Sequence, residues 1–150
     1  MFAGRYDHSL DDKGRTMVPK RFRTRLAALG DESVWITNAL GSPNHLDVRP
    51  SSLFTLYQER IGALTETPQV LLYKRFYFGS AIEVEIDSAG RALVPVSLRN
   101  RCGLTDKISF VGLDAARFQL WRPQDLDTSF EYCNLHSAEL LAHLAELEGR

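Results

Sequence analysis

The stretch Leu10-Asp11-Asp12-Lys13-Gly14-Arg15-Thr16-Met17-Val18-Pro19 decides the fold of this 150-residue chain, because a second version of it lies 76 residues further on. That second version is Ile86-Asp87-Ser88-Ala89-Gly90-Arg91-Ala92-Leu93-Val94-Pro95. Between residues 10–25 and 86–101, seven of sixteen positions are identical, whereas chance would give about one. The identical pairs are Asp11/Asp87, Gly14/Gly90, Arg15/Arg91, Val18/Val94, Pro19/Pro95, Arg23/Arg99 and Arg25/Arg101. Self-similarity of this strength predicts a duplicated structural unit.

Each copy carries the chemistry of a tight turn followed by a helix start. Aspartate side chains bond to nearby backbone amides and glycine adopts a positive φ, so residues 11–14 and 87–90 are predicted turns. The residues on either side favour strands, which would form a hairpin or a bent pair. Proline then stands where a helix can begin. The unit is therefore strand, turn, strand, short helix, two further strands and a helix.

The predicted elements follow this unit through the chain. The first copy predicts strands at 2–10, 15–18, 33–37 and 45–48, and helices at 20–29 and 51 to about 64. The second predicts strands at 81–86, 91–94, 107–111 and 118–121, and helices at 96–102 and 124 to about 132. Residues 69–78 and 137–147 have the pattern of two more helices. We divide the chain into a first repeat (1–65), a helical connection (66–79), a second repeat (80–132) and a C-terminal helix (133–150).

A unit of this length is too short to build a large core of its own. We therefore expect an α+β fold in which the two tandem β-β-α-β-β-α repeats pack about a pseudo-two-fold axis as one β-barrel with peripheral helices. The turns around Arg15 and Arg91 would then project from related places.

The composition is that of a soluble globular protein: 44% hydrophobic and 25% charged residues. No apolar run approaches the roughly 18 residues of a membrane span, and the first residues lack the apolar core of a signal peptide. Cys102 and Cys133 are too few for a disulfide framework and lack zinc-site spacing. These features predict a cytoplasmic protein without a metal or other cofactor.

The charge distribution changes the meaning of a net charge of −1. Residues 1–30 carry seven Lys/Arg against three acids, and residues 31–150 carry eleven against sixteen. A basic patch on an otherwise acidic protein is typical of a surface that binds nucleic acid. The run from Lys20 to Arg25 has no interleaved acid, unlike an ordinary solvated face.

Arginine in a tight turn, braced by an aspartate four residues earlier, is a rigid donor for phosphate or a guanine edge. The purely structural alternative is a hairpin with an internal Asp–Arg pair, and a duplicated fold would duplicate it. The basic run next to the first turn favours the binding interpretation.

The chain resembles the MraZ family of bacterial transcriptional regulators, in the AbrB-like (swapped-hairpin) superfamily. The resemblance covers essentially the whole chain and rests on both Asp-x-x-x-Arg turns with the Val-Pro that follows each, on Met1-Phe2, on Arg21-Phe22-Arg23, on Leu98-Arg99 and on Trp121. It implies two AbrB-like halves, closed-ring homo-oligomers and double-stranded DNA binding at repeated elements upstream of a division and cell-wall operon.

By this resemblance Asp11, Arg15, Asp87 and Arg91 are the motif residues, and we expect Lys13, Lys20 and Arg21 to hold phosphates. The second turn has Ser88-Ala89 where the first has Asp12-Lys13, and Val96-Ser97 replaces Lys20-Arg21. We therefore expect the first half to dominate DNA contact and the second to serve mainly as scaffold.

Other functions stay open. An antitoxin-like or scaffolding module of the same fold would share the basic turn but need a long partner-binding tail, which we do not expect here. An enzyme is not expected, because no Gly-rich phosphate loop, HExxH or Gly-x-Ser-x-Gly motif occurs. His136, Glu139 and His143 could bind a metal, but we expect solvated helix residues. The aromatics at 73–78 suggest core or subunit interface more than base stacking.

Overall fold

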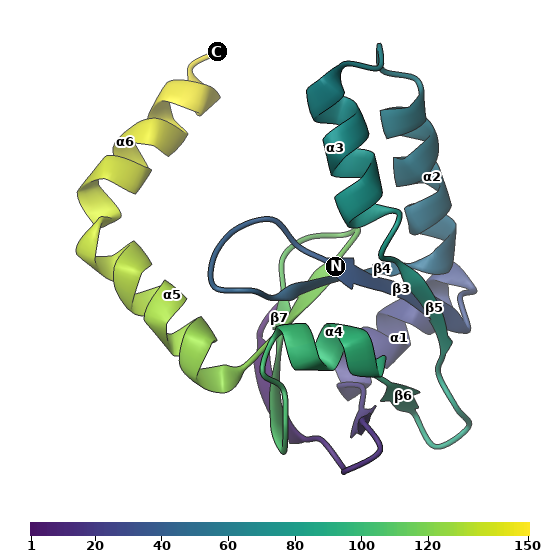
Figure 1. The fold of residues 1–150 in the computed structure, drawn as a ribbon. Helices are drawn as coiled ribbons and strands as arrows, with labels where there is room; N and C mark the ends of the chain where they lie inside the picture. Colours follow the sequence, from purple (N-terminus) through teal and green to yellow (C-terminus); the bar gives the residue numbers. More distant parts are fainter.

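The computed structural model describes all residues from 1 to 150. It contains eight strands: β1 (Arg5–Ser9), β2 (Arg15–Met17), β3 (Ser33–Asn38), β4 (Leu46–Pro50), β5 (Ile82–Glu85), β6 (Arg91–Leu93), β7 (Lys107–Gly112) and β8 (Phe118–Trp121). Six helices accompany them: α1 (Lys20–Leu29), α2 (Ser51–Gly62), α3 (Pro68–Tyr77), α4 (Val96–Arg101), α5 (Pro123–Leu135) and α6 (Ser137–Glu148) (Figure 1). The predicted order of elements is confirmed, and most boundaries agree within three residues.

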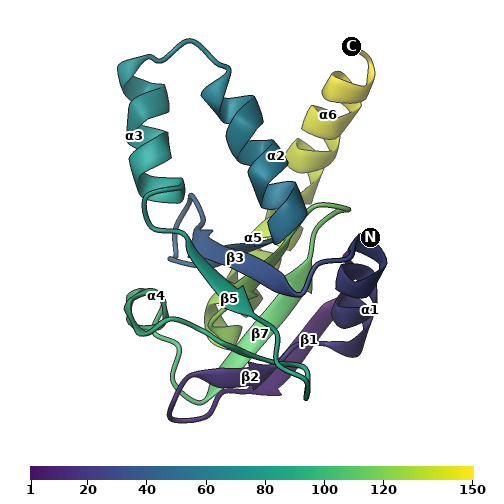
Figure 2. The ribbon, with the colours of Figure 1, turned by 90° about the vertical axis from the view of Figure 1, so that its right-hand side faces the viewer.

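The strands form a six-stranded antiparallel sheet, ordered β1-β7-β8-β4-β3-β5, and a separate two-stranded ribbon of β2 and β6. Both orders are symmetric between the two halves of the chain. If β1, β2, β3 and β4 are exchanged with β5, β6, β7 and β8, the same order results, read from the other edge. At the sheet centre β4 pairs with β8, while β1 lies beside β7 and β3 beside β5 (Figure 2). Every one of these three pairings joins the two halves of the chain.

Two expectations about the sheet are wrong. The sheet is not a closed barrel: β1 and β5 remain its edges, because β2 and β6 hold three residues each and pair with one another. Of the two alternatives for the strands beside each turn, the hairpin is also wrong, since β1 pairs with β7 and β2 with β6, which leaves the bent pair. The ladder between the two sides of the first turn is limited to an isolated bridge between Leu10 and Thr16.

One core of 19 buried residues fills the space between sheet, ribbon and the helices α1 and α4, and both halves supply it. Phe22 of α1 lies near its centre, with ring centroids 5.3 Å from Phe2 and 4.7 Å from Phe118. Gly30 ends α1 in the left-handed conformation, as its position predicts. Because Phe118 belongs to the second half, α1 is held by residues from both halves.

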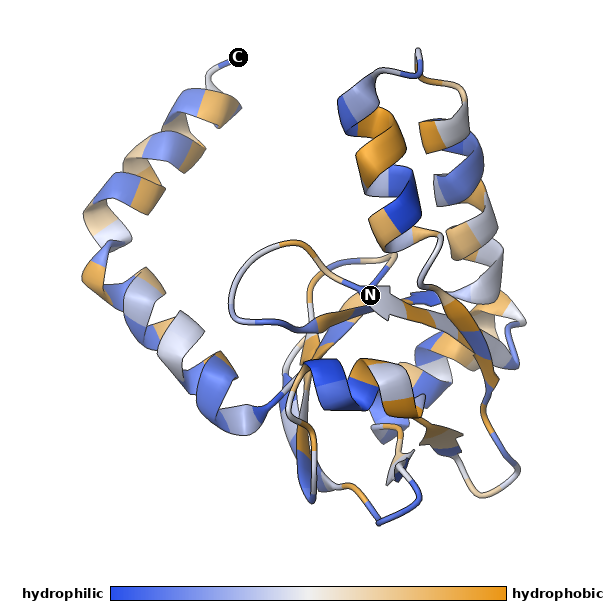
Figure 3. Ribbon diagram, viewed as in Figure 1, coloured by the Kyte–Doolittle hydropathy of each residue, from blue (hydrophilic) through white to orange (hydrophobic).

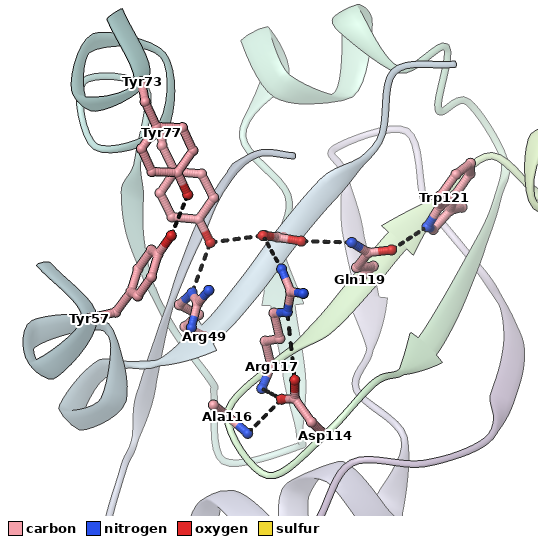
Figure 4. A network of polar contacts seen from close by, with 10 residues as sticks. Arg49, Tyr57, Tyr73, Tyr77, Asp114, Ala116, Arg117, Gln119 and Trp121 are labelled. Atoms are coloured by element: carbon pink, nitrogen blue, oxygen red, sulfur yellow. Dashed lines mark hydrogen bonds and ion pairs between the residues drawn. The ribbon is translucent and has the colours of Figure 1, made fainter. Parts of the chain in front are cut away.

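The opposite face of the sheet centre carries a buried polar network (Figure 4). The carboxylate of Asp47 on β4 accepts hydrogen bonds from Tyr77 Oη (2.8 Å), Gln119 Nε2 (2.8 Å) and Arg117 Nη1 (3.2 Å). Arg49 Nε donates to the same tyrosine oxygen at 2.8 Å. Burial raises the pKa of Tyr77. Tyr77 thus ties α3 to β4, and Asp47 extends the network to Arg117 and Gln119 of the second half.

Two helical arms extend from this body. In Figure 1, α2 and α3 form a hairpin on one side, whereas α5 and α6 run outward on the other. Helix α6 buries no residue, although hydrophobic bands follow both arms (Figure 3). Its exposed apolar residues are Leu140, Leu141, Leu144 and Leu147. No helix has the length and apolar character needed to cross a membrane.

Candidate nucleic-acid interface

The first turn is closed by one carboxylate. Asp11 Oδ1 accepts hydrogen bonds from the backbone N–H groups of Lys13 (3.0 Å) and Arg15 (2.8 Å), and Oδ2 accepts from Arg15 Nε at 2.8 Å. The N–H of Asp11 donates to the carbonyl of Arg15 at 3.0 Å. Gly14 supplies the positive φ (+90°) that closes this loop. The guanidinium is therefore held through Nε, which leaves its terminal nitrogens free of protein partners at this turn.

The second turn repeats this geometry. Asp87 accepts from the N–H groups of Ala89 (3.0 Å) and Arg91 (2.8 Å), and from Arg91 Nε at 3.1 Å. Gly90 has a φ of +88°. The side chains of Arg15 and Arg91 keep similar exposed fractions, 40% and 43%. Both turns thus hold an arginine in the same orientation. The pairing with aspartate uses Nε and leaves the terminal guanidinium nitrogens available to a ligand.

The hydrogen bonds lower the pKa of both aspartates, and in each case the largest cause is the backbone N–H four residues later. For Asp11 desolvation is the second-largest effect and opposes this shift, while the side-chain bond and charge of Arg15 lower the pKa further. Because the folded-state pKa is depressed, the ionised carboxylate stabilises the turn above the unfolded-state pKa, about 3.9. That contribution is lost as the pH falls through the lower folded-state value.

We expect the carboxyl groups of Asp11 and Asp87 to titrate below the usual aspartate range in a carbon-detected NMR titration. In Arg15→Ala the midpoint of Asp11 should rise only part of the way, because the backbone N–H bonds remain. Asp87 serves as the internal control and should not move. A wild-type Asp11 that titrates in the ordinary range would contradict this geometry.

The ribbon brings the two arginines onto one surface. In its register Arg15 is opposite Leu93, Thr16 is opposite Ala92 and Met17 is opposite Arg91. Because side chains alternate along a strand, the middle pair points to the core and is buried, while Met17 and Leu93 are 40% and 48% exposed. The exposed face of the ribbon therefore carries an arginine at each of two opposite corners, with an apolar side chain beside each.

Two further arginines each contact the turn of the opposite half. Arg23 Nε donates to the Val18 carbonyl at 3.0 Å, and its guanidinium lies against Gly90 of the second turn. Arg99 Nε donates to the Val94 carbonyl at 2.9 Å and lies against Gly14 of the first turn. Each short helix thus packs on the turn of the other half. The identity of Arg23 and Arg99 in the two copies was the sequence signal for this role, which our sequence interpretation missed.

Gly90→Ala should lower the free energy of unfolding by about 1–3 kcal/mol, because alanine is strained at this φ. The new Cβ would also lie 2.8 Å from Arg23 Cδ and displace that side chain. Thermal unfolding followed by circular dichroism measures the change. Gly62→Ala is the matched control, since a Cβ there meets nothing within 4 Å and should leave stability unchanged or slightly raised. Equal behaviour of the two variants would contradict the proposed strain.

The chain matches a known protein family in two segments. A family model described as "MraZ protein, putative antitoxin-like" matches residues 1–70 and 77–147, two segments whose starts are 76 residues apart. The chain belongs to the MraZ family. The resemblance inferred from the paired turns is confirmed. The two matched segments contain one Asp-x-x-x-Arg turn each.

Curated MraZ relatives have similar sequences to this chain over most of their length. A protein named transcriptional regulator MraZ from Desulfitobacterium hafniense (strain DSM 10664 / DCB-2) is 36% identical over 81% of this chain and 80% of its own. Its counterpart from Chromobacterium violaceum is 36% identical over 92% and 93%, respectively. That from Lachnoclostridium phytofermentans is 31% identical over 97% and 96%. All three are named as regulators of transcription, in keeping with a MraZ chain expected not to be an enzyme.

The structure places the candidate residues of this MraZ chain differently from the sequence expectation in one respect. Lys20 and Arg21 are exposed, as expected. However, the N–H of Val18, just before α1, donates to the carbonyl of Gly90 at 3.0 Å. The basic helix therefore starts beside the second turn rather than the first, because β2 pairs with β6 and carries the chain across the ribbon.

Proposed function

We propose that this MraZ-family protein is a sequence-specific regulator that binds double-stranded promoter DNA through the exposed face of the β2–β6 ribbon. The observation that carries the proposal is the pair of preorganised arginines, Arg15 and Arg91, on one face of a two-stranded ribbon. A ribbon of this kind fits the major groove of B-DNA, where arginine is a bidentate donor to guanine O6 and N7. Asp11 and Asp87 orient these arginines and do not themselves contact the DNA.

The lysines and arginines around the ribbon would neutralise phosphates. Lys13 lies in the first turn, while Lys20 and Arg21 start α1; all three are exposed. Phosphate contacts position a protein on DNA but carry little sequence information. A few such contacts per chain give weak binding that falls steeply with salt.

We further propose that the chain, with two AbrB-like halves (1–65 and 80–132), assembles into a closed homo-oligomeric ring on tandem elements upstream of its own division and cell-wall operon. Apolar leucines on α6 (Leu141 and Leu144) and on the other arm (Leu56 and Leu72) are exposed in the single chain. Burying a leucine stabilises an interface by about 1.5–3 kcal/mol. A head-to-tail contact between two different arms can close into a ring.

Ring assembly and weak contacts per chain support each other. Several subunits on tandem sites gain effective concentration, so affinity rises without a new contact. Such a protein would be cytoplasmic and associated with the nucleoid.

The test is fluorescence anisotropy of a labelled duplex taken from the region upstream of the chain's own coding sequence, against a shuffled duplex of equal composition. Native mass spectrometry, with and without the duplex, gives the assembly. We expect tighter binding to the upstream duplex and a mass several times the 17.0 kDa of one chain. Equal affinity for both duplexes would overturn sequence specificity, and a 17.0 kDa species would overturn the ring.

The antitoxin-like or scaffolding alternative is favoured by one observation, the exposed apolar face of α6. In that case α6 would cover a partner protein rather than a second copy. A monomeric chain that binds neither duplex would favour this alternative.

A further inference from the structure

We infer that each DNA-contacting end of the ribbon is composite: the turn of one half works with the helix start of the other half. This inference rests on the proposed function and assigns Lys20 and Arg21 to the second turn. The expectation that one half dominates binding is then replaced by two ends that each combine residues of both halves.

The ribbon register carries the first step. Arg91 lies opposite Met17, the last residue of β2, and Arg15 lies opposite Leu93, the last residue of β6. Residues opposite one another on neighbouring antiparallel strands have Cβ atoms about 5 Å apart. Helix α1 starts at Lys20, three residues after Met17, and so begins at the end of the ribbon that holds Arg91. In the same way α4 begins, with Val96, at the end that holds Arg15.

Contacts outside the ribbon support the same assignment. The N–H of Val18 donates to the Gly90 carbonyl at 3.0 Å, and that of Val94 donates to the Gly14 carbonyl at 2.8 Å. Arg23 of α1 lies against Gly90, whereas Arg99 of α4 lies against Gly14. Arg99 Nη2 also donates to the carbonyl of Lys13 at 3.4 Å. Each helix is therefore attached to the opposite half's turn through both its backbone and a side chain.

The composite arrangement moves positive charge to the second turn: Asp11, Asp12, Lys13 and Arg15 sum to zero, whereas Asp87, Arg91, Lys20 and Arg21 sum to +2. The end with Arg15 has Lys13 in its own turn and a neutral helix start, Val96-Ser97. The end with Arg91 has a neutral turn, Ser88-Ala89, and receives Lys20 and Arg21 from α1. Each end thus combines one preorganised arginine with an exposed basic flank, and both flanks come from the first half: Lys13 lies in the first turn itself, whereas Lys20 and Arg21 reach the second turn through α1.

Photo-crosslinking tests this arrangement in the full chain bound to the upstream duplex. In a Cys133→Ser background, which removes the exposed native thiol, single variants Lys20→Cys, Ala89→Cys and Asp12→Cys carry the same thiol-linked photoprobe. Ala89 and Asp12 are exposed reference positions in the second and first turns. We expect adducts from Lys20→Cys to map to the same base-pair steps as those from Ala89→Cys. Adducts that coincide with those of Asp12→Cys, or none at the Ala89→Cys steps, would overturn the inference.

A double-mutant cycle on the same duplex gives an independent measure. Lys20→Ala combined with Arg91→Ala should deviate from the product of the single effects on Kd by about threefold or more, as interacting neighbours do. Lys20→Ala combined with Arg15→Ala should equal the product. The reverse pattern would overturn the inference while leaving DNA binding intact. Failure of the unsubstituted chain to bind the duplex would instead overturn the proposed function, and the inference with it.

Discussion

Arg15→Ala is expected to weaken binding of the upstream duplex by about 10- to 100-fold, because a bidentate arginine–guanine contact is worth about 1–3 kcal/mol. The loss should be largest at one or two base pairs of the element, and base substitutions there should no longer matter to the variant. Fluorescence anisotropy on the native duplex and on single-base variants measures both effects. Arg91→Ala is expected to produce a comparable loss, since its turn has the same geometry.

Arg75→Ala is the control for charge. Arg75 is exposed on α3, so its removal makes the same change in net charge away from the ribbon. The affinity of the Arg75→Ala variant for the upstream duplex should stay within about twofold of wild type. Thermal melting should show all three variants folded, because the arginine side chains lie at the surface. An Arg15→Ala variant that binds like Arg75→Ala would disprove the role of this face.

The second large effect concerns stability. Asp47→Ala should lower the free energy of unfolding by about 3–5 kcal/mol, because several donors lose their acceptor and each buried polar group left unsatisfied costs about 1–3 kcal/mol. The buried carboxylate joins α3 to both central strands, and its loss would leave Arg117, Gln119 and Tyr77 without their shared acceptor. For a chain of this size the melting temperature should fall by roughly 10–15 °C.

Asp12→Ala is the matched control, because Asp12 is exposed and such surface changes are usually worth less than about 0.5 kcal/mol. Asp47→Asn keeps the shape and some acceptor capacity and should fall between the two. If Asp47→Ala melted within 2 °C of the control, the network would not be coupling α3 to the sheet.

Sequence reasoning reached most of the fold because its signals are local. The turn around Asp11 is specified by hydrogen bonds spanning four residues, and Gly30 ends α1 for reasons contained in one helical turn. The order of elements follows from hydrophobic periods and from proline and glycine positions. The family followed from the two turns and the residues around them.

Strand pairing could not be obtained in this way. A turn of this chemistry usually joins two paired strands, yet β1 and β2 diverge after it and find partners about a hundred and about seventy-five residues away. The barrel expectation failed for the same reason, because closure depends on strand lengths and edges that no local pattern encodes. The role of Asp47 was also missed, since a single buried aspartate in a strand has no sequence pattern of its own.

The sequence alone determined the duplication, the two braced arginines and the basic run at the start of α1. Only the tertiary structure decided which turn receives that basic run. The choice depends on pairing between β2 and β6, which is stabilised by burying Ala92, Val18 and Val94 and by packing α1 into a core shared by both halves. Such long-range packing is invisible to rules that relate a residue to its near neighbours, and it places the first half's charges at the second half's turn.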